Sequence, residues 1–459
     1  MKILKEGDRR VAKIINKKTL GEDALYRISS LSYRYSKDGR YLIRNTLSFE
    51  VTELTEQENT ALSQLDDAPV TLDFIRDNGL EQLARSRCIV ETDYDEAGKY
   101  RQVIFLLKTM AGRKEGITSY TILPTTACNA RCTYCYEEGI AVRSMSPDTA
   151  DRLVDYICEN RAGHKVSLHW FGGEPTAAAH IITRICTALS EREVPFTSDM
   201  ITNASLITRA LAREAKEVWH LRRVQVSLDG YRTDYELRKR YLDPAGHNYD
   251  TAMRAVHYLA DEGIKVDMRV NIDTENLPRI EAFLHDIKAE FPDTSNISLY
   301  LALLFQAQHS ADCIPLYREL FRLSDIQKQL GIPQNFASDH KSVRIRTNYC
   351  MADSDGKSVV IAPDGSFNNC EHLPEGRSWG NIFFGVTDPA LYERLFAPVL
   401  PDEQCEKCPF LPECTPFYKK GCPGWFEQCR EYHSLRLESI LGRLLEGTDS
   451  ERLSETDEQ

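Results

Sequence analysis

Three cysteines stand close together in the segment TTACNARCTYCYEEG. They are Cys128, Cys132 and Cys135, so three and then two residues separate the successive thiols. Thiolates at such spacing are ligands for iron–sulfur clusters or for zinc. A cubane cluster has four irons, so three ligands would leave one iron able to bind another molecule. The spacing therefore predicts a cluster with an open iron, or else a zinc site that a distant histidine completes.

A second group of seven cysteines occupies the C-terminal part of the chain. It consists of Cys350, Cys370, Cys405, Cys408, Cys414, Cys422 and Cys429. A zinc ribbon is the alternative here, because Cys-x2-Cys pairs also bind zinc. Seven thiols do not divide evenly into four-ligand zinc sites, so clusters are the better interpretation. The remaining four cysteines are expected to be small buried hydrophobic residues, because each stands singly among apolar neighbours: Cys88, Cys158, Cys186 and Cys313.

Composition narrows the class of protein. The 459 residues carry a net charge of −12 with a pI near 5.5, which argues against general affinity for nucleic acid. No apolar run approaches the roughly 20 residues of a membrane span, and the N-terminus has no apolar signal region. We therefore expect no membrane partner and a cytoplasmic location. Thiols stay reduced there, so 14 cysteines suggest metal chemistry rather than disulfides.

Strands and helices alternate from about 117 to 335, which predicts a parallel α/β fold with six units forming a partial (β/α)6 TIM barrel. The expected strands are 119–124, 166–171, 196–202, 224–229, 265–272 and 297–303. One helix should begin after Ser146 with Pro147 in its first turn, and another should end at Gly263. Chemistry gathers at the C-terminal ends of the strands in such barrels.

Small polar residues follow four consecutive strands. The cysteine loop follows the first strand, and Gly172, Gly173 and Glu174 follow the second. Paired glycines allow backbone amides to approach a ligand, and a carboxylate suits an ammonium group. Thr202 and Asn203 follow the third strand, and the sequence Ser-Leu-Asp-Gly that begins at residue 227 ends the fourth. Packing alone does not explain this pattern.

These motifs together resemble the radical S-adenosylmethionine (SAM) enzymes over roughly residues 117–310. In that family the open iron binds the amino and carboxylate groups of SAM, and an electron from the cluster generates a 5′-deoxyadenosyl radical that removes a substrate hydrogen. The resemblance implies cluster ligation by Cys128, Cys132 and Cys135. It also implies SAM contacts from Tyr134, Gly172, Gly173, Glu174 and Ser227, with Thr202, Asn203 and Asn271 as weaker candidates. The basic residue for the SAM carboxylate falls among Arg238, Lys239 and Arg240, and Lys239 is favoured.

The second cysteine group resembles the SPASM extension of radical SAM enzymes, which carries two auxiliary 4Fe-4S clusters and is expected over 345–440. The family's ligation would assign Cys350, Cys370 and Cys422 to the first cluster and the other four cysteines to the second. Seven residues separate Cys414 from Cys422 where the family usually has three, so the position of Cys422 departs from the pattern. Three ligands on the first auxiliary cluster would leave an iron for a substrate group, such as a peptide thiolate, or for a ligand other than cysteine.

Residues 1–112 read as a small α+β domain that contains a hairpin followed by helices, compatible with a winged helix. A helix is expected from Thr55, with Glu58 in the capping-box position. This order resembles the leader-recognition domains of peptide maturases, which add a peptide as an extra strand. Residues 1–48 carry a net charge of +7, which would suit an acidic leader, and residues 49–96 carry −10. A capping domain with solvated charges is the alternative. Residues 446–459 are expected to form an acidic, solvated tail.

SPASM enzymes mostly modify peptides or proteins. The sequence therefore predicts an enzyme that installs a thioether or carbon–carbon crosslink in a ribosomally made precursor peptide, with flavodoxin or ferredoxin as electron donor. One alternative is a sulfatase-maturase-like oxidation of Cys or Ser to formylglycine. Another is an iron–sulfur redox sensor that binds DNA. The residues do not identify a catalytic acid or base.

Overall fold

The computed structural model describes residues 1–5, 9–16, 19–110, 115–308, 310–334, 357–368, 370, 378–396, 403–414 and 428–446. Cys350, Cys422 and nearly all of the expected acidic tail lie outside these ranges. The described residues form two compact units. One contains residues 1–110 together with 403–414 and 428–446, and the other contains the described residues from 115 to 396.

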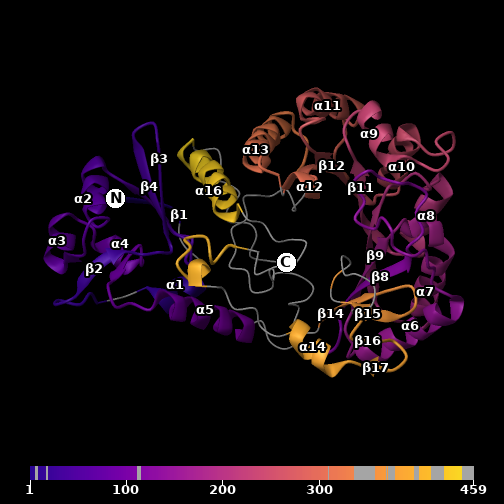
Figure 1. Ribbon diagram of the computed structural model, residues 1–459, viewed down its shortest axis with the longest axis horizontal. Helices are drawn as coiled ribbons and strands as arrows, with labels where there is room; N and C mark the ends of the chain where they lie inside the picture. Colours follow the sequence, from indigo (N-terminus) through magenta and orange to yellow (C-terminus); the bar gives the residue numbers. More distant parts are fainter. Residues whose placement is uncertain are drawn as a thin grey trace. The chain divides into compact units, whose positions relative to one another are not determined.

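Six parallel strands in sequential order form the centre of the second unit (Figure 1). They are β8 (Ser119–Thr125), β9 (Val166–Gly172), β10 (Phe196–Thr202), β11 (Leu221–Leu228), β12 (Lys265–Ile272) and β13 (Ile297–Leu303). The predicted α/β fold is confirmed, and strand β11 begins three residues earlier than expected. Helices follow the strands, as in α6 (Pro147–Asn160), α7 (Ala179–Glu191), α8 (Arg209–Glu217), α10 (Tyr249–Asp261) and α11 (Leu277–Glu290).

The sheet does not end at β8. Strand β14 (Ser358–Ile361) lies parallel to β8, and β15 (Ser366–Asn368), β16 (Gly380–Asn381) and β17 (Gly385–Val386) continue in antiparallel order. The described strands thus form an open ten-stranded sheet with β13 at one edge and β17 at the other.

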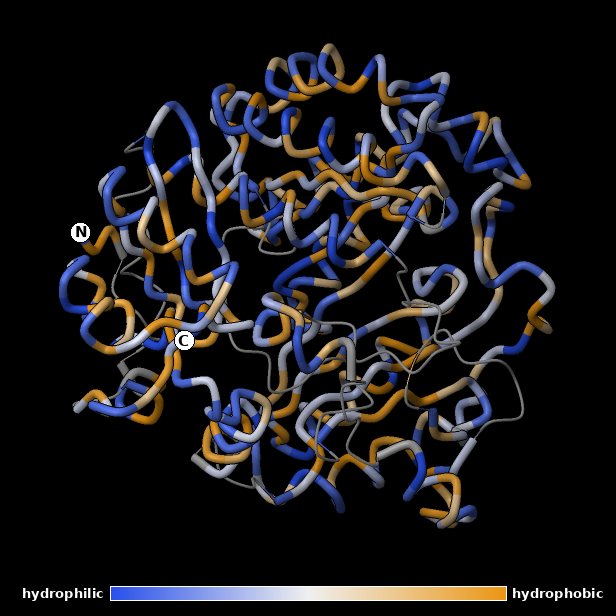
Figure 2. Tube along the Cα trace, turned by 60° about the vertical axis from the view of Figure 1, so that its left-hand side comes forward, coloured by the Kyte–Doolittle hydropathy of each residue, from blue (hydrophilic) through white to orange (hydrophobic). Residues whose placement is uncertain are grey.

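Alternation of side chains gives the barrel strands two different faces. Val166, Leu168 and Trp170 of β9 are buried, while Ser167 and His169 between them are partly exposed. Successive side chains of a strand point to opposite faces, so the apolar set packs under the helices. Helices α6, α7, α8 and α10 lie along one side of the strands in Figure 1, and Figure 2 shows the mixture of hydrophobic and hydrophilic residues along both kinds of element. The opposite face of the sheet is left for polar side chains.

The helix boundaries follow local chemistry. The Ser146 hydroxyl accepts the backbone N–H of Thr149, and Pro147 occupies the first turn of α6, as predicted. Gly263 follows α10 with φ of +69°, a conformation that costs glycine little. Thr55 and Glu58 form the predicted capping box of α2 (Glu56–Gln64).

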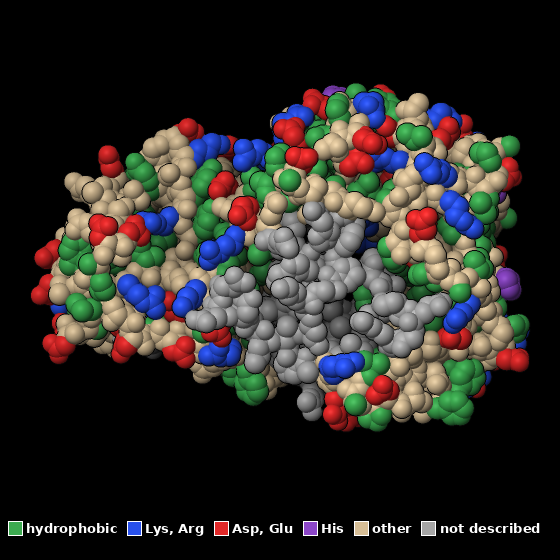
Figure 3. All heavy atoms as spheres, viewed as in Figure 1, with side chains coloured by type: hydrophobic (Ala, Val, Ile, Leu, Met, Phe, Trp, Pro, Cys, Tyr) green, Lys and Arg blue, Asp and Glu red, His purple; other side chains and the backbone are tan. Residues whose placement is uncertain are grey.

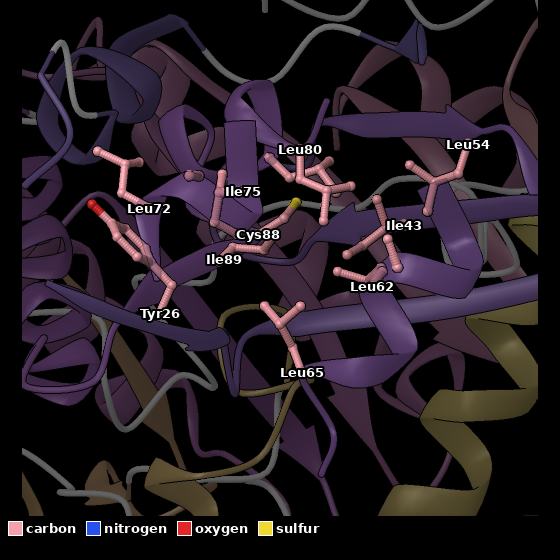
Figure 4. Close-up of a cluster of buried hydrophobic side chains, with 13 residues drawn as sticks. Tyr26, Ile43, Leu54, Leu62, Leu65, Leu72, Ile75, Leu80, Cys88 and Ile89 are labelled. Atoms are coloured by element: carbon pink, nitrogen blue, oxygen red, sulfur yellow. The ribbon is translucent and has the colours of Figure 1, made fainter. Parts of the chain in front are cut away.

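The first unit contains two antiparallel sheets. The larger has the order β1 (Lys2–Lys5), β5 (Val51–Leu54), β4 (Arg40–Asn45) and β3 (Ser32–Lys37), and the smaller has the order β6 (Val70–Thr71), β2 (Leu25–Ile28) and β7 (Ile89–Glu91). A cluster of apolar side chains that includes Tyr26, Leu62 and Cys88 forms a core of this unit (Figure 4). Cys88, Cys186 and Cys313 are fully buried, and Cys158 is partly exposed.

The C-terminal helix α16 (Cys429–Leu445) belongs to this first unit. Leu437 and Leu441 of α16 pack with Leu42 and Val51 of the larger sheet. We predicted a C-terminal domain over 345–440, whereas the described residues of that range are divided between the two units. This segment is rich in Gly, Pro and Cys and has little core of its own, so its apolar side chains are buried against other parts of the chain.

Charges of both signs are interspersed on the described surface of the face shown in Figure 3. None of the helices in the described ranges is both long enough and apolar enough to span a membrane.

Candidate functional site

The loop after β8 carries Cys128, Cys132 and Cys135. All three are free thiols and partly exposed. Burial is the main cause that raises the pKa of each, and for Cys128 burial together with Glu174 and the other two thiols raises the pKa to about 12. Three nearby thiolates are therefore unfavourable without a cation to bind them. This donor set fits an iron–sulfur cluster with three protein ligands.

The loop is fixed to the C-terminal end of helix α9 (Arg232–Lys239). The backbone N–H of Arg131 donates to the carbonyls of Lys239 and Arg240 at 3.1 and 3.0 Å, and the N–H of Thr133 donates to the Arg238 carbonyl at 2.9 Å. The last carbonyls of a helix have no partner within the helix. Here the amides of the cysteine loop satisfy them, so α9 positions the loop relative to strand β11, which precedes it.

A buried polar network lies under the same loop. The Tyr134 hydroxyl donates to Asp229 Oδ2 at 2.7 Å, and Lys239 Nζ donates to the Tyr134 oxygen at 2.9 Å. Asn271 Nδ2 donates to Asp229 Oδ1 at 2.8 Å. Asp229 is fully buried and Lys239 is 3% exposed. Burial alone would lower the pKa of Lys239, but Asp229, Tyr134 and Cys132 outweigh it and hold this pKa well above its usual range.

The structure thus brings together Tyr134, Lys239 and Asn271, but as partners of Asp229. From the sequence, Asp229 stood out only as part of the Ser-Leu-Asp-Gly motif, although its position directly after a buried strand was a usable signal. The two other basic candidates differ from Lys239. Arg238 pairs with Asp273 at 2.6 Å and is buried, whereas Arg240 is exposed and ends α9 in a left-handed conformation.

The glycines after β9 are required by the cysteine loop itself. A Cβ atom at Gly172, whose φ is +115°, would lie 2.4 Å from the Thr125 carbonyl oxygen, and one at Gly173 would lie 2.4 Å from the Ala127 oxygen. The N–H of Gly173 donates to the Thr125 carbonyl at 3.2 Å. The N–H of Glu174 donates to the Ala127 carbonyl at 2.8 Å. We expected the glycine amides to face a ligand. In the structure the amides of Gly173 and Glu174 hold the cysteine loop.

Glu174, Thr202 and Asn203 form one cluster at the ends of β9 and β10. Glu174 is 1% exposed. Its Oε1 accepts the Thr202 hydroxyl at 2.6 Å and the Thr176 N–H at 3.0 Å, and its Oε2 accepts the Asn203 N–H at 2.8 Å. These donors are neutral, and no Lys or Arg of the described chain forms an ion pair with Glu174. A buried carboxylate without a cation is costly, so this site is suited to an ammonium group of a ligand.

Asn129 connects this cluster to the cysteine loop. Asn203 Nδ2 donates to Asn129 Oδ1 at 2.9 Å, and Asn129 Nδ2 donates to the Ser205 hydroxyl at 2.9 Å. Asn129 was not among the predicted site residues, although its place directly after Cys128 was a signal. Ser227 stands near the end of β11, opposite Arg269 of β12 in the strand register, and is partly exposed on the polar face of the sheet.

The same polar face carries His169, which was not among the predicted site residues. His169 Nδ1 lies 2.7 and 2.8 Å from the two Asp199 oxygens, and His169 Nε2 lies 3.0 Å from the Ser119 hydroxyl. These residues belong to the neighbouring strands β8, β9 and β10, and 34% of the His169 side chain and 43% of the Asp199 side chain are exposed. Their alternation with buried apolar residues was the available signal.

The C-terminal cysteines within the described ranges fall in both units. Cys370 lies in the second unit, and Cys405, Cys408, Cys414 and Cys429 lie in the first. Burial raises the pKa of Cys414 above its usual range, and the other three thiolates of this set would raise it further. In the part of the chain that the structure describes, no three Cys, His, Asp or Glu side chains converge on a position for one metal ion.

An open sheet of six parallel strands with a three-thiol loop after the first strand and a buried carboxylate after the second defines the radical SAM class. Residues 122–287 match the family model described as "Radical SAM superfamily". Enzymes of this superfamily use SAM and a 4Fe-4S cluster, and the three-thiol loop lies within the matched residues.

Two curated proteins are similar over part of the chain. One is Fe-coproporphyrin III synthase of Methanosarcina barkeri, 32% identical over 169 residues, which are 36% of this chain and 40% of that protein. The other is a probable GTP 3′,8-cyclase of Thermococcus kodakarensis, 31% identical over 159 residues, 34% of this chain and 48% of that protein. The chain therefore spans less than half the length of these relatives.

Solved structures share the fold. The structure of anSMEcpe with bound AdoMet and the Cp18Cys peptide superposes with a TM-score of 0.57 at 16% identity and covers 72% of this chain and 99% of that one. Streptococcus suis SuiB bound to the precursor peptide SuiA superposes with a TM-score of 0.51 at 16% identity, over 88% of this chain and 100% of that one.

Proposed function

We propose that this chain is a radical SAM peptide maturase, in which the loop thiols Cys128, Cys132 and Cys135 hold the SAM-binding cluster. When bound, SAM and its cluster supply a 5′-deoxyadenosyl radical that removes a hydrogen atom from the substrate. Flavodoxin or ferredoxin would donate the electron. The observation that carries the proposal is the buried Glu174 carboxylate, which has neutral donors and no cation beside the cysteine loop. A SAM ammonium group would supply the missing positive charge.

The residues around the loop have separate tasks in this proposal. Glu174 accepts the SAM ammonium, while Thr202 and Asn203 hold that carboxylate in place. Gly172 and Gly173 let β9 approach the loop backbone. We assign Lys239 to positioning the loop through Tyr134 and Asp229, because its ammonium is already bonded there, and the SAM carboxylate is left to Arg238 or Arg240. Ser227 near the end of β11 and Asn271 near the end of β12 are proposed as further polar contacts.

A peptide substrate is proposed from the C-terminal cysteine block and from the fold shared with proteins solved with peptides. We propose that Cys350, Cys370 and Cys422 hold one auxiliary cluster, and that Cys405, Cys408, Cys414 and Cys429 hold a second. The polar face of the sheet, with His169 and Asp199, would contact the peptide.

Residues 1–112 are proposed to bind the leader of the precursor as an added strand. Basic residues of the N-terminal sheet that could attract an acidic leader already form ion pairs within the chain. Arg34 pairs with Asp66 at 2.8 Å, Lys37 with Glu446 at 2.6 Å and Arg40 with Glu53 at 2.6 Å. Backbone pairing at a sheet edge is therefore the stronger basis for recognition than net charge.

Coexpression with each short reading frame beside the gene, followed by mass spectrometry of the peptide, tests this function. A crosslink appears as the loss of two hydrogens from a peptide in the presence of the intact enzyme, and it disappears with the Cys128→Ala variant. Conversion of a Cys to formylglycine would instead remove sulfur and add oxygen, which supports the sulfatase-maturase-like alternative. Unmodified peptides throughout would contradict both activities.

A further inference from the structure

The segment that carries Cys405, Cys408 and Cys414 is tied to the N-terminal sheet by a buried ion pair. Glu413, directly before Cys414, is 4% exposed and accepts a hydrogen bond from Nη2 of Arg44, which lies on β4 and is 2% exposed. The second Glu413 oxygen lies 3.7 Å from Arg436 Nη1 on α16. One carboxylate thus joins the N-terminal sheet, the cysteine segment and the C-terminal helix.

The apolar residues of the cysteine segment are also buried among N-terminal side chains. Phe410 packs with Leu42 and Val51 of the larger sheet, and its ring centroid lies 5.3 Å from that of Tyr33. Leu411 packs in a separate cluster that includes Val11, Tyr100 and Val103, with Cys405 against it. Phe410 and Leu411 are 4% and 2% exposed. The segment between Cys405 and Cys414 therefore takes its core from residues 1–110.

Helix α16, which begins at Cys429, is held by the same sheet. The Tyr33 hydroxyl lies 2.6 Å from the Ser434 hydroxyl and donates to Glu438 Oε1 at 3.0 Å. Arg40 Nη1 donates to the Leu445 carbonyl at 2.6 Å. Strands β3 and β4 thus contact both the segment that ends in Cys414 and the helix that starts with Cys429, so they set the relative position of these thiols.

One buried donor in this region has no partner. Arg44 Nε is buried and finds no hydrogen-bond acceptor within the described ranges. Buried donors are normally satisfied. Within the described ranges, the Glu413 carboxylate is the acceptor that holds Arg44.

We infer that the site of Cys405, Cys408, Cys414 and Cys429 is built jointly by the N-terminal sheet and the C-terminal segment, with Arg44 as a positioning residue. The inference rests on the proposed function, because it takes these four cysteines to be cluster ligands. It gives residues 1–110 a task besides leader binding. The N-terminal region is then required for cluster assembly even when no peptide is present.

The test is the iron and sulfide content of the full chain after anaerobic reconstitution. Cys128, Cys132 and Cys135 are changed to Ala throughout, so that the iron that remains belongs to the C-terminal cysteines. Arg44→Met is compared with Arg76→Met as a matched control, because Arg76 pairs with Glu22 in the same unit at 2.7 Å but with 42% and 69% of the two side chains exposed. We expect Arg44→Met to lose about four irons per chain, one cubane, and Arg76→Met to lose none.

Thermal unfolding of the iron-free proteins separates positioning from a failure to fold. An iron-free Arg44→Met chain that melts like the control but holds less iron supports the inference. If Arg44→Met does not fold, Glu413→Gln, which keeps the shape of the side chain, is expected to show the same loss of iron. Equal iron content in Arg44→Met, Glu413→Gln and the control would contradict the inference that the site is built jointly, while the proposed function would still hold. No iron in the parent with the three alanines would overturn both.

Discussion

The Lys239 ammonium lies 2.9 Å from the Tyr134 hydroxyl, and this contact joins the end of helix α9 to the middle of the cysteine loop. Tyr134 in turn donates to the fully buried Asp229 at the end of β11. The lysine, the tyrosine and the aspartate form one hydrogen-bonded unit, which fixes the loop to the end of α9 and to the end of β11. The network explains how the cysteine loop, which contains no regular helix or strand, holds its thiols in place.

Replacing Lys239 by Met should destabilise the protein by about 3–5 kcal/mol, because the buried Asp229 carboxylate loses its cation. We expect lower iron content in the cysteine loop and a lower unfolding temperature, measured on the reconstituted chain. Lys216→Met is the control, since Lys216 makes only an exposed contact with the Gly263 carbonyl. An unchanged iron content with a raised KM for SAM would instead show that Lys239 binds the SAM carboxylate.

Gly173→Ala should destabilise the loop by about 1–3 kcal/mol, because its Cβ would meet backbone oxygens that cannot move aside without shifting the cysteine loop. Iron content and thermal unfolding measure the effect. In the control Gly246→Ala the new Cβ meets only the side chain of Asp243, which can rotate away. Equal behaviour of the two variants would show that β9 does not constrain the loop.

Glu174→Gln should weaken SAM binding by roughly 10- to 100-fold, since a hydrogen bond to a charged group contributes about 1.5–3 kcal/mol. Calorimetric titration of SAM into the reconstituted chain gives the affinity. Glu193→Gln, on the exposed turn before β10, is the control. Unchanged SAM affinity in Glu174→Gln would remove the carboxylate from the binding site.

His169→Gln should leave deoxyadenosine release from SAM intact and reduce formation of the modified peptide. The reason is that His169 lies on the polar face of the sheet, three residues before Gly172, rather than at the strand ends near the cysteine loop. His257→Gln is a matched control, because His257 forms a His–carboxylate contact of 2.8 Å with Glu290 between the helices α10 and α11. Equal product yield in both variants would exclude a role for His169 with the peptide.

Alkylation of Cys128 in the iron-free chain should keep accelerating as the pH rises to about 12, because burial raises the pKa of this thiol to about 12. The folded state holds the proton more tightly than the unfolded chain, so stability is lost as the pH rises through this range and thiolate forms. Mass spectrometry of iodoacetamide adducts gives the profile. A plateau near pH 9 would indicate an ordinary exposed thiol.

The sequence predicted the parts of the fold that depend on local pattern. The alternation of strand-like and helix-like segments identified all six barrel strands. The predicted helix ends at Ser146, Thr55 and Gly263 were correct, because each depends on residues within a few positions. Thiol spacing located the cysteine loop for the same reason. The α/β fold, and the resemblance of residues 122–287 to radical SAM enzymes, could therefore be predicted from the residues alone.

Contacts between residues far apart in the chain could not be predicted from the sequence. Arg44 and Glu413 are separated by 369 positions. The residues next to each of them in the sequence form no pattern from which the other could be predicted. Lys239 was assigned to SAM from its place in a motif, whereas the buried Asp229 beside it decides where its ammonium lies. Gly173 was expected to face a ligand, and only the path of the cysteine loop shows which backbone it meets.

The most direct measurement is the yield of 5′-deoxyadenosine when the reconstituted, reduced chain is given SAM without oxygen. We expect release by the intact chain, loss of release in Cys128→Ala, Cys132→Ala and Cys135→Ala, and retention in Cys158→Ala. An intact chain whose loop holds iron but releases no deoxyadenosine, or a Cys128→Ala chain that releases as much as the intact one, would contradict the account.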